Sequence, residues 1–181
     1  MADPASRLMR LHAAGHRPQL LAQIDAIFWE TAARTFAPGP ERDAFRERWL
    51  GRYLQGGSDV VLVALVGGDT VAGYLVGALE DPAAQPRFAD MGYFRNDFAD
   101  LARQFPAHLH INLAAAFRSR GIGAQLIDVF AGHAKRAGAP GMHVVTGKGM
   151  RNVSFYERCG FVERGTALWN GREIVFLGRD L

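Results

Sequence analysis

The residues best suited to chemistry lie in one basic, glycine-containing stretch, Arg118-Ser119-Arg120-Gly121-Ile122-Gly123. An alternating pattern typical of a strand precedes it, and a helical pattern follows. The first N–H groups of a helix lack intrahelical acceptors, and the helix dipole adds partial positive charge there. Glycine at 121 and 123 lets the main chain approach a ligand closely. The stretch therefore predicts a site for an anion such as a diphosphate, with Arg118 and Arg120 as mobile countercharge; the alternative is an ordinary helix start with solvated arginines.

Two nucleotide-binding motifs were tested against the sequence, and neither fits. The dinucleotide pattern G-x-G-x-x-G requires glycine where Leu126 stands. A P-loop ending at Gly147-Lys148 has Met142 in place of its first glycine and Gly149 in place of its Ser or Thr. A nucleotide-phosphate protein that uses Gly147-Lys148 is therefore disfavoured.

The elements that must position the basic stretch follow from hydrophobic periodicity. Helical spacing begins after Pro18 and is expected to end at Pro38-Gly39-Pro40, and a second helix is expected over 41–54. The runs 60–66 and 71–77 flank a glycine-containing turn and predict a β-hairpin. The remaining expected elements are a strand over 107–113, a helix from Gly121 to 136, a strand over 142–146, a helix over 150–159 and two strands around Asn170-Gly171. This order predicts a single α/β domain over 1–181 with a mixed sheet. Its segment 1–17 is poorly defined, with 8–12 as a candidate first strand before a turn at Gly15.

The connection 81–106 is longer than compact domains usually leave without structure. It contains five aromatic residues: Phe88, Tyr93, Phe94, Phe98 and Phe105. We expect 81–106 to be an insertion that shapes the acceptor site, because it joins the hairpin to the strand that carries His108 and His110. Its rings could line a pocket for the acceptor, with Tyr93 and Phe94 as contacts, or they could form a satellite core under a long loop. Both interpretations stay open. Arginines and aspartates balance within the segment, so it does not indicate the charge of a substrate.

Two motifs together carry a resemblance to a known family. The stretch at 118–123 matches the acyl-CoA signature Q/R-x-x-G-x-G/A of the GCN5-related N-acetyltransferase (GNAT) superfamily, and Phe155-Tyr156-Glu157-Arg158-Cys159-Gly160-Phe161 resembles its closing F-Y-x-x-x-G-F segment. The predicted order of elements from Pro18 to Leu181 is also similar. The resemblance implies a GNAT-like mixed, partly splayed central sheet with helices on both faces, and an acyl-CoA-dependent N-acetyltransferase.

The resemblance also implies which residues contact acetyl-CoA, the expected cosubstrate. The pantetheine would pair with the backbone of 112–114, the diphosphate would lie on the amides of 119–124, and a backbone N–H at the end of the 107–113 strand would stabilise the oxyanion. Tyr156 matches the tyrosine that protonates the departing CoA thiolate, and a phenol is protonated at neutral pH. In the family Asn is common where Gly149 stands; Asn152, one helical turn before Tyr156, is the candidate substitute. The cofactor-binding residues expected on this basis are Asn112, Leu113, Ala114, Arg118, Ser119, Arg120, Gly121, Ile122, Gly123, Ala124, Asn152 and Tyr156.

The general base is open among several residues. His108 and His110 alternate along the strand that leads into the basic stretch, and imidazole titrates near neutral pH. The alternative for either is a hydrogen-bonded structural histidine. Glu80 and Asp81, at the end of the preceding strand, are further candidates, either as the base or as groups that bind a cationic amine.

Composition excludes several classes of protein: nucleic-acid-binding, membrane-spanning and disulfide- or zinc-stabilised. The net charge is only +3, which is too small and too mixed for a nucleic-acid partner, and the run 60–66 is too short to cross a membrane. The single cysteine, Cys159, excludes an intramolecular disulfide and a zinc site of paired cysteines, and no metal is expected.

We expect a cytoplasmic enzyme that acetylates a small-molecule, peptide or protein amine by direct transfer in a ternary complex. The alternative is a non-catalytic CoA- or partner-binding module with the same fold. The acceptor and the oligomeric state stay open, although homodimers are frequent among similar proteins.

Overall fold

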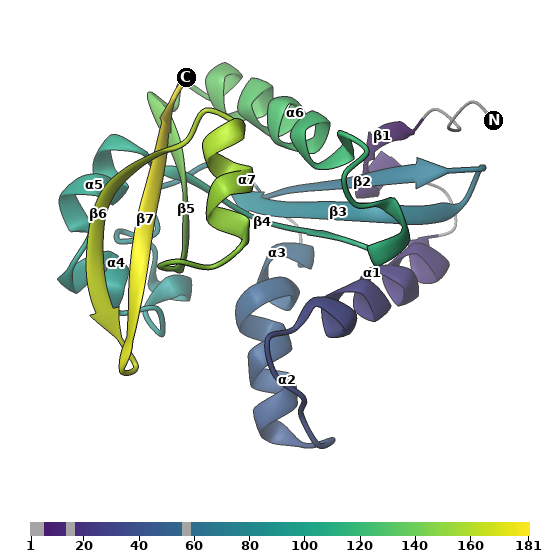
Figure 1. The fold of residues 1–181 in the computed structure, drawn as a ribbon, viewed down its shortest axis with the longest axis horizontal. Coiled ribbons are helices and arrows are strands. Elements are labelled where there is room, and N and C mark those ends of the chain that lie inside the picture. The colour runs from purple at the N-terminus through teal and green to yellow at the C-terminus, as the bar shows by residue number, and fades with distance from the viewer. Residues whose placement is uncertain (1–5, 14–16, 56–58) are drawn as a thin grey trace. The chain divides into compact units, whose positions relative to one another are not determined.

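The computed structural model describes residues 6–13, 17–55 and 59–181. Its strands form one mixed seven-stranded sheet in the order β1-β2-β3-β4-β5-β7-β6 (Figure 1). The strands are β1 (Arg7–Arg10), β2 (Val60–Val66), β3 (Thr70–Ala78), β4 (Ala107–Leu113), β5 (Gly141–Gly147), β6 (Val162–Trp169) and β7 (Arg172–Asp180). The main helices are α1 (Arg17–Thr31), α2 (Pro40–Arg46), α3 (Arg52–Leu54), α4 (Tyr93–Asn96), α5 (Ala99–Gln104), α6 (Ile122–Arg136) and α7 (Asn152–Arg158). The predicted α/β fold with a mixed sheet is confirmed.

The chain divides into two compact units. The first comprises Met1–Gly77 and His110–Phe130, and the second comprises Ala78–Leu109 and Ala131–Leu181. The division falls inside β4, between Leu109 and His110. The parallel register of β4 with β5 pairs Ala107 with Met142 and His108 with His143, all in the second unit. The N-terminal and C-terminal halves of β4 therefore belong to different packing environments.

In the first unit, the β2–β3 hairpin forms the core and shapes the end of β4. Every residue of β2 is buried. Opposite Ala64 and Leu65 of β2 stand Gly73 and Val71 of β3, so Ala72 is an extra, bulged residue. The carbonyl of Ala72 accepts the N–H of Ala114, just after β4. A Cβ on Gly73 would lie 2.8 Å from the carbonyl oxygen of Asn112, so only glycine allows this approach.

The helices of the first unit differ from the prediction at their ends. α1 stops at Thr31 rather than at Pro38, and the Thr31 hydroxyl donates to the carbonyls of Ile27 and Phe28 in its last turn. The expected helix over 41–54 is helical throughout, but it contains a π-helical turn at Glu47–Gly51 between α2 and α3. Of the candidate strand over 8–12, residues 8–10 belong to β1, which begins at Arg7, whereas Leu11 and His12 lie in the 3-10 turn Leu11–Ala13. The expected turn at Gly15 lies outside the described residues.

The second unit contains the hairpin of β6 and β7, paired in turn to β5. Asn170 and Gly171 both have positive φ angles, 51° and 72°, as a tight two-residue hairpin turn requires. The connection 81–106 is largely structured, with a 3-10 turn at Pro86–Phe88 followed by α4 and α5. Its five aromatic side chains are each at most 5% exposed. They form a core, as the second of the two interpretations held.

Candidate active site

The basic stretch forms a strand-to-helix turn in the first unit. A 3-10 turn at Ala115–Phe117 leads from β4 to the start of α6. Ser119 and Gly121 take left-handed φ angles of 62° and 78°. The first helical bond of α6 runs from the N–H of Gln125 to the carbonyl of Gly121, so the N–H groups of 122–124 precede it. Left-handed residues next to a helix start turn successive amides toward one side, which is the geometry of an anion-binding nest.

The surroundings of Gly121 fit an anionic ligand. An added Cβ at Gly121 would meet no heavy atom within 4 Å, and the residues from Arg118 to Gly121 are all exposed. A non-glycine residue with positive φ, such as Ser119, costs conformational energy that surrounding structure must sustain. The backbone of the turn at Gly121 is therefore accessible from solvent, as contact with a ligand requires.

The side chain of Asn112 is held inside the first unit. Its Nδ2 donates to the hydroxyl of Tyr74 over 2.8 Å. Tyr74 is fully buried, and burial raises the pKa of its phenol above the ordinary value, so it stays protonated. The predicted backbone pairing of pantetheine at 112–114 does not require the Asn112 side chain, so the contact with Tyr74 is compatible with it.

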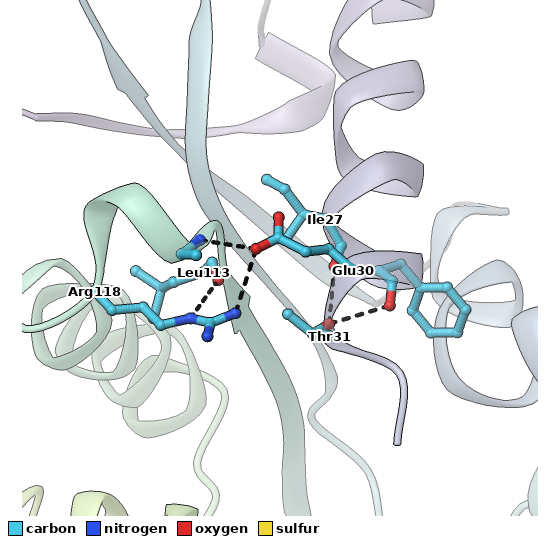
Figure 2. A network of polar contacts seen from close by, with 7 residues as sticks. Ile27, Glu30, Thr31, Leu113 and Arg118 are labelled. Atoms are coloured by element: carbon cyan, nitrogen blue, oxygen red, sulfur yellow. Dashed lines mark hydrogen bonds and ion pairs between the residues drawn. The ribbon is translucent and has the colours of Figure 1, made fainter. Parts of the chain in front are cut away.

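Arg118 is tied to the protein rather than mobile. Its Nε donates to the carbonyl of Leu113 over 3.1 Å, and its Nη2 lies 3.6 Å from Oε1 of Glu30 on α1 (Figure 2). The same Glu30 oxygen accepts the N–H of Ala115 over 3.1 Å. The expectation of two mobile countercharges therefore does not describe Arg118 in this structure. Arg120 lies with its guanidinium 5.6 Å from the centre of the Phe117 ring.

His110 lies in a partly aromatic, partly buried site in the first unit. Its Nε2 is 3.1 Å from the hydroxyl of Tyr53, and its ring meets the ring of Trp49 edge to face at 5.2 Å. Trp49 lies in the π-helical turn, and Tyr53 follows it in α3. Burial, with the nearby Arg52 cation, lowers the pKa of His110 to about 4. The imidazole is therefore neutral at neutral pH and carries a lone pair.

His108 has different surroundings, in the second unit. It is 2% exposed, meets Phe88 edge to face at 4.7 Å, and stacks on His143 at 5.5 Å. Phe94 also contacts both imidazoles. His143 lies in turn against Phe176. These are the contacts of a packed aromatic core.

Tyr156 lies on α7 in the second unit, where it is 6% exposed. Its ring contacts Phe155 and Phe161 at 5.3 and 5.7 Å. Burial is the main cause that raises the pKa of its phenol, and the nearby Cys159 adds to it. The hydroxyl thus keeps its proton at neutral pH and is a donor, although a weaker acid than an exposed tyrosine.

Asn152 is the candidate substitute for the asparagine expected where Gly149 stands, and both residues have defined surroundings. Gly149 has a φ of 74°, a left-handed conformation that favours glycine or asparagine. The amide of Asn152 exchanges two hydrogen bonds with the hydroxyl of Thr146, at 2.9 and 3.2 Å. Asn152 therefore joins the start of α7 to the end of β5, and its contact with pantetheine stays a prediction.

The remaining predicted residues lie in the second unit. Asp81 Oδ1 accepts the N–H of Ala83 over 2.8 Å, so it caps its own turn. Glu80 is exposed. Tyr93 and Phe94 are 2% and 3% exposed and pack on each other, and Tyr93 also meets Trp169. Their surroundings are those of a core, and a role in an acceptor site stays a prediction for all four.

Lys148 does not have the environment of a phosphate-binding lysine. Its Nζ lies 3.3 Å from a carboxylate oxygen of Glu173 and 3.8 Å from one of Glu163. Two carboxylates beside the ammonium compete with any anion. The structure thus adds to the sequence argument against a nucleotide-phosphate site at Gly147-Lys148.

Sequence reasoning missed three residues that contact the predicted site: Glu30, Tyr53 and Tyr74. Each lies more than thirty positions before its partner in the chain, so periodicity could not connect them. One signal was present. Glu30 is an acidic residue in the last turn of a helix, where the dipole favours cations.

The described residues were also considered as metal ligands and as membrane-spanning helices, and they form neither. In residues 6–13, 17–55 and 59–181, no group of three or more His, Cys, Asp or Glu side chains could hold a metal ion. Across that same part of the chain, every helix is too short or too polar to cross a membrane.

An α/β fold with an anion-binding turn at a strand-to-helix junction agrees with the resemblance seen in the sequence, and comparison with known proteins identifies the family. Residues 21–161 match the model of the acetyltransferase (GNAT) family. Because the match covers most of the chain, the protein belongs to this family. The resemblance found in the sequence is confirmed.

Solved structures share the fold at low identity. A GCN5-related N-acetyltransferase from Kribbella flavida is 20% identical, with a TM-score of 0.66 and coverage of 98% of both chains. Ribosomal-protein-alanine N-acetyltransferase from Brucella melitensis is 21% identical, with a TM-score of 0.64 and coverage of 97% of this chain and 99% of that one. A protein from Bacillus anthracis, provisionally assigned as a streptothricin acetyltransferase and solved in complex with acetyl coenzyme A, is 19% identical, with a TM-score of 0.53 and coverage of 72% and 67%.

Proposed function

We propose that this protein is an N-acetyltransferase that transfers the acetyl group of acetyl-CoA directly to an amine acceptor in a ternary complex. The observation that carries the proposal is the strand-to-helix turn, with left-handed Ser119 and Gly121 before the first-turn amides of α6, in a chain of the GNAT family. The acceptors named for the similar proteins are a ribosomal-protein alanine and streptothricin. A peptide N-terminus and a small-molecule amine are therefore the two acceptor classes to screen.

The first unit would bind and orient the donor. The amides of 119–124 would hold the diphosphate, and the backbone of 112–114 at the end of β4 would pair with the pantetheine arm. A backbone N–H at this end of β4 would stabilise negative charge on the acetyl oxygen during transfer. No side chain needs to supply that charge stabilisation, because a fixed peptide dipole requires no reorganisation during the reaction.

His110 is the base that we assign to the acceptor amine, in preference to His108. A neutral imidazole can accept a proton at every pH above its low pKa, and His110 lies on the same strand as the proposed oxyanion donor. A base with a low pKa is always available but weak, so its contribution belongs at the lower end of the usual range. His108, enclosed by Phe88, Phe94 and His143, lacks the room to meet a substrate.

Tyr156 is the residue that we assign to the departing thiolate. Its raised pKa keeps the phenol protonated, so it donates a hydrogen bond to the sulfur as negative charge develops there. Because a weaker acid gives up its proton less readily, we expect hydrogen-bond donation to contribute more than completed proton transfer.

Binding of the donor is tested with a matched pair of glycine variants. Gly121→Glu places a side chain and a negative charge against the turn, whereas Gly67→Glu makes the same change at another left-handed glycine with no heavy atom within 4 Å of an added Cβ. We expect Gly121→Glu to weaken CoA binding at least 100-fold in calorimetric titration, and Gly67→Glu to leave it within twofold. Acetyl-CoA and CoA should bind to the wild-type protein and ATP should not.

Turnover is tested by the release of free CoA thiol on addition of amines, with Tyr156→Phe as the variant. We expect its kcat to fall about 10- to 100-fold with an unchanged Kd for CoA, because the ring and its packing remain. CoA binding without thiol release from any amine would favour the non-catalytic module. Binding of ATP but not CoA would contradict the proposal and would favour the hypothesis of a nucleotide-phosphate site at Gly147-Lys148.

A further inference from the structure

Glu30 connects helix α1 to both ends of the short turn that precedes the anion site. Its Oε1 accepts the N–H of Ala115 at 3.1 Å and lies 3.6 Å from Nη2 of Arg118. Arg118 then donates from Nε to the carbonyl of Leu113 at 3.1 Å. Figure 2 shows these contacts as one connected set: Arg118 contacts the Leu113 carbonyl at the end of β4 directly, and the Glu30 carboxylate joins Arg118 to the backbone just after β4. We call these four residues, Glu30, Leu113, Ala115 and Arg118, the turn clamp.

The position of Glu30 is unfavourable for the helix that carries it. The last turn of α1 contains no basic residue, and a carboxylate there faces the negative end of the helix dipole. A carboxylate has no hydrogen to donate, so Glu30 cannot satisfy the carbonyls of this turn; those of Ile27 and Phe28 accept from the Thr31 hydroxyl. Local helix energetics would favour a different residue at position 30. The contacts of the Glu30 carboxylate with Ala115 and Arg118 suggest that it serves the turn and not the helix.

The ion pair alone would be a weak reason for such a role. Both side chains are nearly half exposed, at 44% for Glu30 and 46% for Arg118, and exposed pairs contribute little because water and salt screen them. The clamp differs from an ordinary surface pair because the same carboxylate oxygen also holds a backbone N–H. Arg118 in addition holds a backbone carbonyl and directly precedes Ser119, the first left-handed residue of the turn. The clamp thus fixes backbone rather than only side chains.

We propose that Glu30 is a positioning residue for the donor site: through the turn clamp it holds the 113–118 backbone so that the amides of 119–124 converge on the diphosphate of CoA. This inference rests on the proposed function. Within the clamp, Arg118 links the Glu30 carboxylate to the Leu113 carbonyl, and Glu30 balances its positive charge. The amides and Arg120 then provide the positive potential that the diphosphate meets.

The test compares two acetyl donors with the same thioester arm. Acetyl-CoA carries the diphosphate and the phosphoadenosine attached to it, whereas S-acetylpantetheine has neither. For Glu30→Ala we expect KM for acetyl-CoA and Kd for CoA to rise about tenfold, with kcat within twofold, while kcat/KM for S-acetylpantetheine stays within twofold. Alanine is a better helix former than glutamate, so α1 itself is not weakened.

Two further variants make the test specific. Glu30→Gln keeps an oxygen that accepts the Ala115 N–H, and we expect KM for acetyl-CoA to stay within about twofold of wild type. Glu41→Ala removes another exposed carboxylate of the same unit, one that pairs with Arg34, and matches the change in net charge. It should leave both donors unaffected.

Three results would overturn the inference. An unchanged KM for acetyl-CoA in Glu30→Ala would show that the turn keeps its shape without the carboxylate. A lower KM would show that Glu30 competes with the diphosphate for Arg118. An equal loss with both donors would show a general structural role. In each case the wild-type protein still uses acetyl-CoA, whereas a wild-type protein that neither binds CoA nor turns over either donor would fail the proposed function itself.

Discussion

Two histidines, His108 and His110, lie two residues apart on β4, and their surroundings differ in almost every respect. His108 belongs to the second unit and is enclosed by Phe88, Phe94 and His143. His110 belongs to the first unit, where Tyr53 and Trp49 contact it. The residue type and the strand are the same, so the difference arises from what packs against each ring.

The comparison shows how one strand can carry a structural and a chemical histidine. In an aromatic core, an imidazole acts as a flat, space-filling ring, and its substitution leaves a cavity. Beside a hydroxyl and an arginine, burial and repulsion hold it neutral, which keeps a lone pair available. Variants at the two positions separate these roles, since each should alter one property, turnover or stability, and leave the other nearly unchanged.

The largest effect is expected for His110→Ala. Loss of the proposed base should lower kcat about 100-fold, at the lower end for general base catalysis, because a base of low pKa is weak. The Kd for CoA should stay within twofold. The measurement is thiol release at saturating acetyl-CoA and acceptor, with the unfolding free energy determined in parallel. A kcat within threefold of wild type would mean that water or another residue takes the proton.

His108→Ala should change stability instead of chemistry. Removal of a ring from a packed core should lower the free energy of unfolding by about 3 kcal/mol, the size typical of large-to-small core substitutions. Denaturant unfolding measures this, with His12→Ala, at an exposed histidine, as a control expected within about 0.5 kcal/mol of wild type. The kcat per folded His108→Ala molecule should stay within about twofold. A large loss of kcat in a folded variant would instead place His108 in the reaction.

The elements of the fold could be predicted where local sequence decides them. The β2–β3 hairpin, the start of α6 after Gly121 and the Asn170-Gly171 turn all depend on neighbouring residues, and all were predicted. The end of α1 was not, because the helix stops at Thr31, several residues before the proline and glycine that signal a helix end in the sequence. The π-helical turn at Glu47–Gly51 also escaped the sequence, since its apolar spacing resembles that of an ordinary helix.

The candidate site likewise contains residues that local sequence predicts and residues that only tertiary contacts bring together. The turn at 118–123 is a continuous segment, so its motif alone predicted a strand-to-helix turn with exposed backbone amides. Tyr53, Tyr74 and Glu30 reach the site through tertiary contacts, and no local pattern links them to His110, Asn112 or Ala115. The five aromatics of 81–106 gave two interpretations because burial depends on what covers them, which their spacing does not encode.

The smallest effect is expected in the pH dependence of stability, and His110 sets its sign. The folded protein has a His110 pKa of about 4, below the ordinary 6.5 that applies to the unfolded chain. Between these values the unfolded chain binds the additional proton, so the contribution of neutral His110 is complete above pH 6.5 and is lost as the pH falls toward 4. The full shift corresponds to at most about 3 kcal/mol, and because the ring is only partly buried we expect about 1 to 2 kcal/mol. Urea unfolding of wild type and His110→Gln from pH 7 to 4.5 measures the difference. The wild type should lose more stability than the variant over this range; equal losses would mean that His110 titrates as an exposed histidine does, and the contrast with His108 would then rest on packing alone.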